Sequence, residues 1–184
     1  MKRSIQCLKK ILPVPETPVE NVGDWDAVEE RLGSKLPQDY KNFISLYGSG
    51  EISEWITVFT PFTTQNGIDL FGIGFGILSH YREYYPEPHP RHFPYTVYPK
   101  PGGLLTWGMT RDGDEFFWRT NGRPDRWDVV VHDRGMIEFY PTEGLTFGEY
   151  LLALLKCDSD VPLSDAARAN LEDHGLTFEP FSAN

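Results

Sequence analysis

Residues 104–140 contain four short runs of apolar and aromatic residues, and a turn signal separates each run from the next. The runs are Leu104–Met109, Glu115–Arg119, Trp127–Val131 and Met136–Tyr140. The connecting segments are RDGD (111–114), NGRPD (121–125) and DRG (133–135), and Asp-Gly and Asn-Gly are strong hairpin signals. Consecutive strands joined by tight turns pair antiparallel. The chain is therefore predicted to be an α+β domain, with a mostly antiparallel central sheet and helices on one face.

A pair of short helices is predicted before this strand region. Asp24 is the expected N-cap of the first helix and Gly33 its stop. The apolar residues between them, Trp25, Val28 and Leu32, have helical spacing. Pro37 suits the first turn of the second helix, and Gly48 closes it. The buried face of the second helix is expected to hold Tyr40, Phe43, Ile44 and Tyr47.

Helices are also expected at both ends of the chain. Residues 4–12 have an apolar face, and the Pro-rich segment 13–20 reads as an extended linker. Thr146-Phe-Gly-Glu149 is a capping box that opens a C-terminal helix, and Ser164 caps a last helix at 165–174. This organisation predicts an N-terminal segment with linker (1–23), an α+β domain (24–156) and a helical extension packed on it (157–184).

The remaining middle segments are predicted from composition. Trp55–Phe59 and Ile68–Ile73 are β-branched and aromatic runs that favour strands. Residues 80–102 are rich in Pro, Tyr and His and are interpreted as an ordered loop, beginning with a helical turn at Ser79–Tyr85. Several large side chains are expected to be largely buried: Trp25, Tyr40, Phe43, Tyr47, Trp107, Leu151 and Leu154.

Composition argues against a membrane protein, a disulfide-rich protein and a nucleic-acid-binding protein. No uncharged apolar run approaches the ~18 residues of a membrane span, and no secretory signal follows the basic start, so no membrane association is expected. Two cysteines, Cys7 and Cys157, make no disulfide framework and favour a reduced, cytoplasmic location. Of the 17 basic side chains, four lie in residues 1–10, against 27 acidic side chains in all. That balance argues against nucleic-acid binding; it fits either a basic protein partner or solubility alone.

Candidate catalytic and metal-binding residues are few. His89 and His92 have a spacing that zinc sites use, but the third and fourth ligands are missing, so no metal is expected. Gly72–Gly76 lacks the spacing of phosphate-binding loops and is interpreted as a bulged strand or an edge turn. No cysteine or serine lies in a nucleophile motif, so neither a cofactor nor an enzymatic activity is predicted.

Two further clusters have competing interpretations. Asp112, Asp114 and Glu115 could serve acid–base chemistry, but Asp is favoured in tight turns because it bonds its own backbone. Trp107, Trp118 and Trp127 could form a ligand-stacking platform, although packing in the core or on the sheet face is the default.

The segments described above resemble the SUKH superfamily, which includes yeast cell-wall-assembly regulators and bacterial immunity proteins. The first similar segment, Trp25–Gly50, has an acidic helix, then Leu-Gly, Leu-Pro and Asp-Tyr-x-x-Phe, and a glycine pair split as Gly48-Ser49-Gly50. The other similar segments are Trp107–Asp114, Phe117-Trp118, Pro124–Val131 and Leu145–Leu152. The resemblance covers about residues 24–155 and implies an α+β fold without enzymatic activity.

The resemblance implies an immunity protein that binds and neutralises a toxin domain, often a nuclease. A regulatory protein-interaction module is the alternative, and a small enzyme or ligand-binding domain that uses the 80–102 loop is a third possibility. Charge and expected turn exposure, rather than any family motif, select the candidate partner-binding residues: Glu51, Glu54, Asp112, Asp114 and Glu115. The expected partner is a cationic toxin domain.

Overall fold

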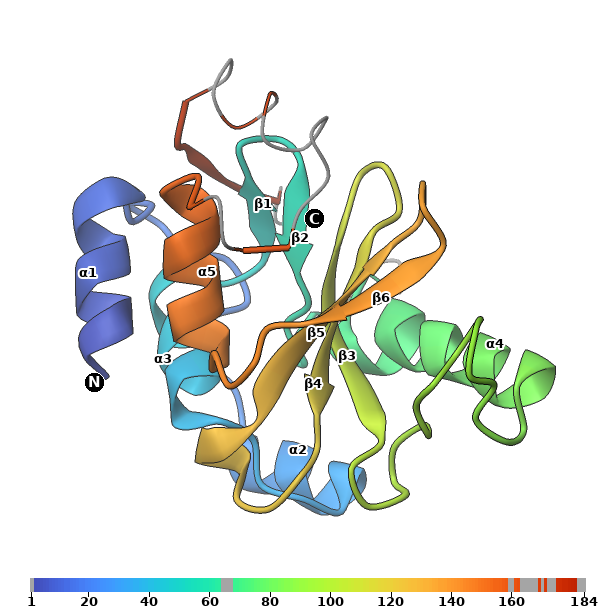
Figure 1. Ribbon diagram of the computed structural model, residues 1–184. Helices are drawn as coiled ribbons and strands as arrows, with labels where there is room; N and C mark the ends of the chain where they lie inside the picture. The colour runs from blue at the N-terminus through green and yellow to red at the C-terminus, as the bar shows by residue number, and fades with distance from the viewer. Residues whose placement is uncertain are drawn as a thin grey trace.

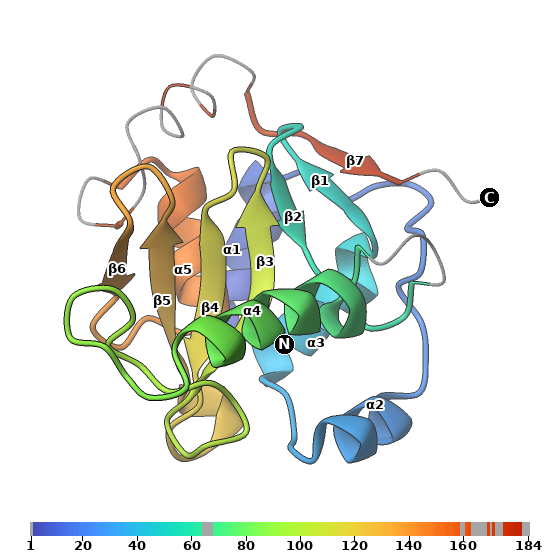
Figure 2. The same ribbon diagram turned by 90° about the vertical axis from the view of Figure 1, so that its right-hand side faces the viewer.

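A seven-stranded antiparallel sheet forms the centre of the molecule (Figure 1, Figure 2). The computed structural model describes residues 2–63, 68–158, 161–162, 169, 171 and 175–181. The strands are β1 (Gly50–Ile52), β2 (Ile56–Val58), β3 (Leu104–Thr110), β4 (Glu115–Arg119), β5 (Asp128–Asp133), β6 (Glu138–Pro141) and β7 (Phe178–Pro180). Their order in the sheet is β6-β5-β4-β3-β2-β1-β7. This architecture confirms the predicted α+β class with a mostly antiparallel sheet.

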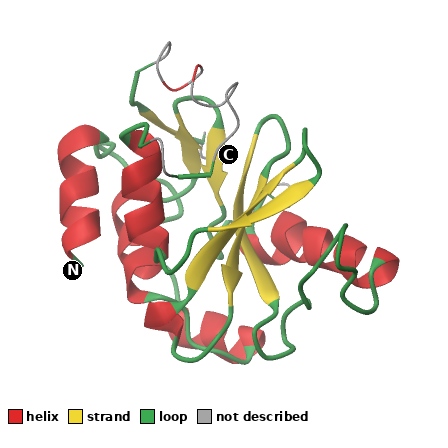
Figure 3. Ribbon diagram, viewed as in Figure 1, coloured by secondary structure: helices red, strands yellow, loops and turns green. Residues whose placement is uncertain are grey.

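Helices lie on both faces of the sheet (Figure 3). One face is covered by α1 (Arg3–Ile11), α3 (Gln38–Tyr47) and α5 (Phe147–Leu155). The other face carries α4 (Phe75–Tyr84), and α2 (Trp25–Leu32) lies at one end of the strands. A 3-10 turn, η2 (Pro124–Arg126), follows β4. The prediction that the helices share one face is therefore wrong for α4.

The error arises in residues 68–84, where the expected strand Ile68–Ile73 is wrong. The Asp69 carboxylate accepts hydrogen bonds from the backbone N–H groups of Phe71 (2.6 Å) and Gly72 (2.8 Å). These bonds start a π-helical turn, η1 (Leu70–Gly74), which runs directly into α4. Gly72–Gly76 is thus a helical start rather than a bulged strand or edge turn. The helix expected only as a turn at Ser79–Tyr85 begins at Phe75.

Local capping signals place α2 and α5 as predicted. The Asp24 carboxylate accepts hydrogen bonds from the N–H groups of Asp26 (3.0 Å) and Ala27 (3.1 Å). Gly33, with φ +78°, ends α2 in the left-handed conformation that favours glycine. The Glu149 carboxylate accepts from the N–H of Thr146 (3.0 Å), as in a capping box.

An aromatic core fills the space between the sheet and the α1, α3 and α5 layer. Tyr40 contacts Trp118 and Phe147 edge-to-face, with ring centroids 5.0 and 5.6 Å apart, and its hydroxyl donates to the Phe59 carbonyl. Burial is confirmed for Tyr40, Phe43, Tyr47, Trp107, Leu151 and Leu154. Trp107, Trp118 and Trp127 are at most 3% exposed, so they pack in the core and form no stacking platform.

Trp25 is the exception among the expected core residues, because it is only half-buried. It lies at the start of α2, outside the sandwich of sheet and helices. There its ring packs against Phe62, with centroids 4.6 Å apart, and the Lys41 ammonium lies 5.8 Å from its centroid. The residue therefore covers the edge of the core rather than filling its interior.

Both ends of the described chain join the same core. Ile5, Leu8 and Leu12 are fully buried, and α1 approaches α5 so closely that a Cβ at Gly148 would lie 2.7 Å from the Ser4 hydroxyl. Near the C-terminus, β7 pairs with β1 in the register Glu51↔Glu179. The helix expected at 165–174 lies mostly outside the described residues. Within those residues, no helix combines the length and apolarity needed to cross a membrane.

Candidate interaction surface

Three tight turns lie side by side at one end of the sheet, seen at the top of Figure 1 and Figure 2. They connect β1 to β2 (residues 53–55), β3 to β4 (111–114) and β5 to β6 (134–137). The pairs Ile56↔Thr110 and Glu115↔His132 bring the three hairpins into one row. We call these three turns and the strand residues next to them the turn end.

Hydrogen bonds tie the three turns together. Trp55 accepts from the Arg111 N–H through its carbonyl (2.8 Å) and donates from its indole Nε1 to the Asp112 carboxylate (2.9 Å). The Asp114 carboxylate accepts from the Arg134 N–H (3.0 Å) in the next turn. The turn end is therefore a connected surface rather than three independent loops.

The turn end holds all five of the predicted partner-binding residues, and their environments differ. Glu54 and Asp112 are exposed, and Glu51 is half-exposed with its carboxylate 3.5 Å from Arg111. Glu54 makes no ion pair with any described residue. Asp133 and Glu138, which were not among the predicted residues, add two carboxylates beside the third turn. Their signal was present in the sequence, because Asp133 is the first residue of the predicted DRG turn and Glu138 lies in the strand expected after it.

The expected exposure of Asp114 is wrong. This residue is 4% exposed, and its carboxylate accepts hydrogen bonds from the Arg134 N–H and the Thr110 hydroxyl (3.3 Å). Burial raises the pKa of Asp114, and the neighbouring Asp133 adds to the effect, while the hydrogen bond from Arg134 opposes it. Asp114 acts inside the protein, holding two turns together, and is not available to contact a partner.

Glu115 is also less exposed than expected, because it connects the sheet to α4. The Tyr81 hydroxyl donates to the Glu115 carboxylate (2.6 Å) and lies 2.9 Å from Nδ1 of His132. Burial, followed by the nearby Glu115 charge, raises the pKa of Tyr81 well above its usual range. The phenol therefore stays protonated and cannot serve as a base. Sequence reasoning missed Tyr81 and His132, which lie 51 residues apart and carry no shared motif.

Two apolar side chains protrude from the third turn. Met136 is 66% exposed and Ile137 is 61% exposed. Ile137 has φ +57°, a left-handed conformation that β-branched residues avoid at a cost of roughly 1–2 kcal/mol. The sequence predicted that a strand would begin at Met136, whereas the turn extends through Ile137 and β6 begins at Glu138.

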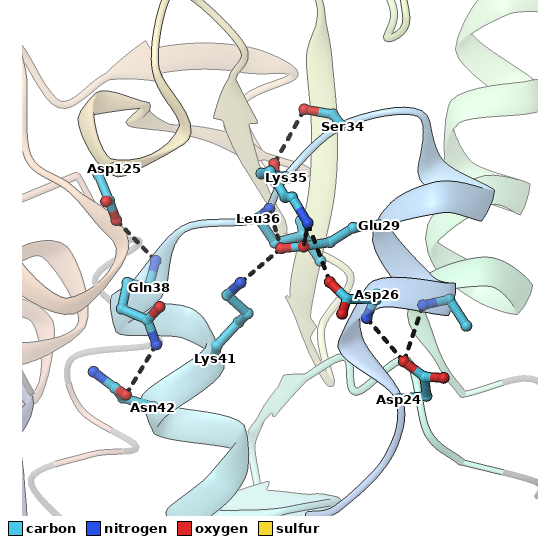
Figure 4. Close-up of polar contacts among 11 residues, drawn as sticks. Asp24, Asp26, Glu29, Ser34, Lys35, Leu36, Gln38, Lys41, Asn42 and Asp125 are labelled. Carbon is cyan, nitrogen blue, oxygen red and sulfur yellow. Dashed lines mark hydrogen bonds and ion pairs between the residues drawn. The ribbon is translucent and has the colours of Figure 1, made fainter.

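At the opposite end of the sheet, ion pairs and hydrogen bonds surround Glu29 of α2 (Figure 4). Its carboxylate accepts from the Leu36 N–H (2.9 Å) and lies 2.7 Å from the ammonium groups of both Lys35 and Lys41. Lys35 also contacts Asp26 at 3.2 Å. These contacts fix the loop between α2 and α3, and we call this region the helix-pair end (residues 24–41).

The contacts at the helix-pair end control the ionisation of Glu29. Burial by itself would raise its pKa, but the Leu36 N–H and the two lysines outweigh that effect and lower it. Asp125 is held in a similar way: the Gln38 N–H donates to it (2.9 Å), and this bond lowers its pKa. Glu29 and Asp125 are thus partnered within the chain.

The 80–102 segment contains the other candidate features. The rings of His89 and His92 stack on each other in an exposed turn, with centroids 4.6 Å apart. In the part of the chain that the structure describes, no group of three or more His, Cys, Asp or Glu side chains could hold a metal ion. A cavity of about 130 Å³ lies nearby and is lined in part by Arg82, Tyr85, Tyr95 and Lys100. Its cations are engaged, since Arg82 donates to the Tyr98 carbonyl (2.8 Å) and Lys100 faces Glu87 at 3.8 Å.

A family model described as SUKH_6, SMI1-KNR4 cell-wall, matches residues 23–151. The chain belongs to this family. The matched range includes the turn end and the helix-pair end, and it confirms the resemblance to the SUKH superfamily. Searches of curated proteins and of solved structures gave no match. SUKH_6 membership supports an immunity or regulatory role that depends on a protein partner.

Proposed function

We propose that this SUKH_6 chain is a cytoplasmic immunity protein that binds a cationic toxin domain and blocks it. The chain itself is proposed to be non-enzymatic and to bind neither nucleic acid nor a cofactor. The proposal rests on the pairing of carboxylates at the turn end. There, Glu54 and Asp112 are exposed and make no ion pair with any described residue, whereas Glu29 at the helix-pair end contacts two lysines.

The charge pattern of the turn end suits this task. Glu51, Glu54, Asp112, Asp133 and Glu138 lie within or beside its three turns, against two basic side chains, Arg111 and Arg134. A toxin that acts on nucleic acid presents cations where it meets phosphate, so a fixed anionic surface competes for the same site. The hydrogen bonds through Trp55 and Asp114 hold the carboxylates in place before binding, which lowers the entropic cost of association.

The test is association kinetics with a candidate cationic toxin domain, sought first in the genes adjacent to this one. We expect a complex whose association rate falls steeply with salt, because the Debye length shrinks from ~10 Å at 0.1 M to ~3 Å at 1 M. Glu54→Lys should slow association, since Glu54 is exposed and makes no ion pair with a described residue. A reversal at Asp114 is unsuitable because that residue is buried.

Glu143→Lys provides a matched control. Like Glu54, Glu143 is an exposed glutamate with positive φ (51° against 54°), but it follows β6 at the end remote from the turns. Equal effects of both reversals would mean that net charge, rather than the turn end, drives association. A complex whose association is indifferent to salt and to Glu54→Lys would place the interface elsewhere. The regulatory alternative would be favoured if the chain failed to bind the toxin domain and captured a host regulatory protein instead.

A further inference from the structure

We infer that Met136 and Ile137 form an apolar anchor that inserts into a pocket on the basic face of the toxin domain. The inference rests on the proposed function and deepens it, because it names the residues that hold the complex together after the charges have steered it. It is motivated by the position of these two side chains in the third turn of the turn end.

The shape of this turn is fixed by contacts at its start and middle. The Asp133 carboxylate accepts from the Met136 N–H (3.0 Å), and the Asp114 carboxylate accepts from the Arg134 N–H (3.0 Å). The turn closes the Asp133↔Glu138 pair of β5 and β6. Met136 and Ile137 are therefore presented at a defined point rather than on a loose loop.

Folding gives no reason for these residue types at these positions. Both side chains are more than 60% exposed, so neither contributes to the core. Ile137 occupies a left-handed conformation at φ +57°, where glycine or asparagine would be less strained. An exposed aliphatic side chain held in a disfavoured conformation is best explained by burial against a partner.

Charge around the anchor identifies the kind of pocket. Asp133 and Glu138 flank the turn directly, and Asp112 lies in the adjacent turn. Carboxylates surrounding a small apolar tip form the polar rim of an interface whose centre excludes water. The complementary site is an apolar pocket bordered by lysines or arginines, and the basic border is what a cationic toxin domain supplies.

The test measures the affinity and dissociation rate of three variants with the same candidate toxin domain. Ile137→Gly removes the anchor while suiting the backbone, and Met136→Ser removes the second apolar side chain. Glu143→Gly is the control, because it makes the same kind of backbone change at φ +51° away from the turn end. We expect each anchor variant to weaken binding by about tenfold or more, mainly through faster dissociation, with the control unchanged.

The outcomes separate this inference from the proposed function. If the wild-type chain binds and both anchor variants bind equally well, the anchor is wrong and the proposed function stands. If the wild-type chain does not bind the toxin domain, both fall. Retained association rates in the anchor variants, together with slowed association in Glu54→Lys, would support the division between apolar anchoring and electrostatic steering.

Discussion

The two ends of the sheet each bury a carboxylate, but the contacts of these carboxylates and the direction of their pKa shifts differ. At the helix-pair end, Glu29 has two lysines at 2.7 Å and a lowered pKa. At the turn end, Asp114 has hydrogen-bond donors but no cation among its described contacts, and its pKa is raised. The helix-pair end therefore compensates the Glu29 charge within the chain, whereas Glu54 and Asp112 at the turn end make no ion pair with any described residue. The contrast separates a carboxylate that is paired within the fold from carboxylates that the proposed function assigns to a partner.

The largest expected difference between the ends comes from truncating side chains. Tyr40→Ala on α3 should lower the free energy of unfolding by about 3–5 kcal/mol, through lost burial and the cavity left behind. Met136→Ala at the turn end should change it by less than about 0.5 kcal/mol, because the side chain is exposed. Urea denaturation of both variants checks the difference. Comparable losses would show that the turn end supports the fold as strongly as the core does.

Neutralising the two buried carboxylates should have opposite effects. Glu29→Gln should cost about 1–3 kcal/mol at neutral pH, because it leaves Lys41 without a charged partner. Asp114→Asn should be neutral or stabilising, since an amide can still accept from the Arg134 N–H and bond Thr110 without a buried charge. Thermal unfolding of the two variants at neutral pH makes the comparison. A more stable Glu29→Gln variant would contradict the compensation assigned to the lysines.

The pH dependence of these two variants sharpens the same comparison. The pKa of Glu29 is lowered on folding, so its stabilisation exists above the unfolded value of about 4.3 and is lost as the pH falls. The pKa of Asp114 is raised on folding, so it favours the folded state below about 3.9 and loses that effect as the pH rises. As the pH rises from about 3 to 7, the loss of unfolding free energy caused by Glu29→Gln should grow. Over the same range, Asp114→Asn should gain relative to wild type in urea titrations.

The smallest expected effect is relief of strain at the third turn. Ile137→Gly should raise the free energy of unfolding by about 0.5 kcal/mol, because release of a left-handed β-branched residue slightly exceeds the entropy cost of glycine. Calorimetry of this variant and of Glu143→Gly makes the comparison. Because glutamate is not β-branched, the difference between the two variants isolates the strain of the isoleucine. A destabilised Ile137→Gly variant would show that the isoleucine contributes to the fold.

Local signals in the sequence were sufficient for the elements that begin and end on capping residues. Asp24, Gly33 and the Thr146–Glu149 box act on backbone groups within a few positions, and the helices start and stop where these residues predict. The β3–β6 hairpins also followed from their turns, although the third turn extends through Ile137 and β6 begins at Glu138. The expected strand at Ile68–Ile73 failed because an apolar run has no distinct period when a single carboxylate, Asp69, starts a helical turn within it.

The candidate site was harder to derive, because burial there depends on partners distant in the chain. From the sequence, Asp114 is expected to be an exposed turn residue. In the structure it is buried and accepts a hydrogen bond from the N–H of Arg134, 20 positions away. Glu115 was expected to be exposed, but it accepts a hydrogen bond from the Tyr81 hydroxyl of α4, a helix that the sequence did not predict in full. By contrast, Glu54 and Asp112 depend only on their own turns, and their exposure was correctly expected. Strand β7 has three residues and forms by pairing with β1, which is distant in the chain, so no local pattern specifies it.

The order of the strands has a consequence for how the chain reaches its fold. From β1 to β6 each strand pairs with its neighbour in sequence, so the β3–β6 meander can form through short-range contacts alone. Two elements break this locality: β7 must return to β1, and α1 must reach α5. We expect β3, β4 and β5 to organise first, with β7 and α1 docking onto them later. Backbone amides of the central strands should then be the slowest to exchange with deuterium, while those of β7 and α1 exchange through smaller openings that leave the turn end assembled.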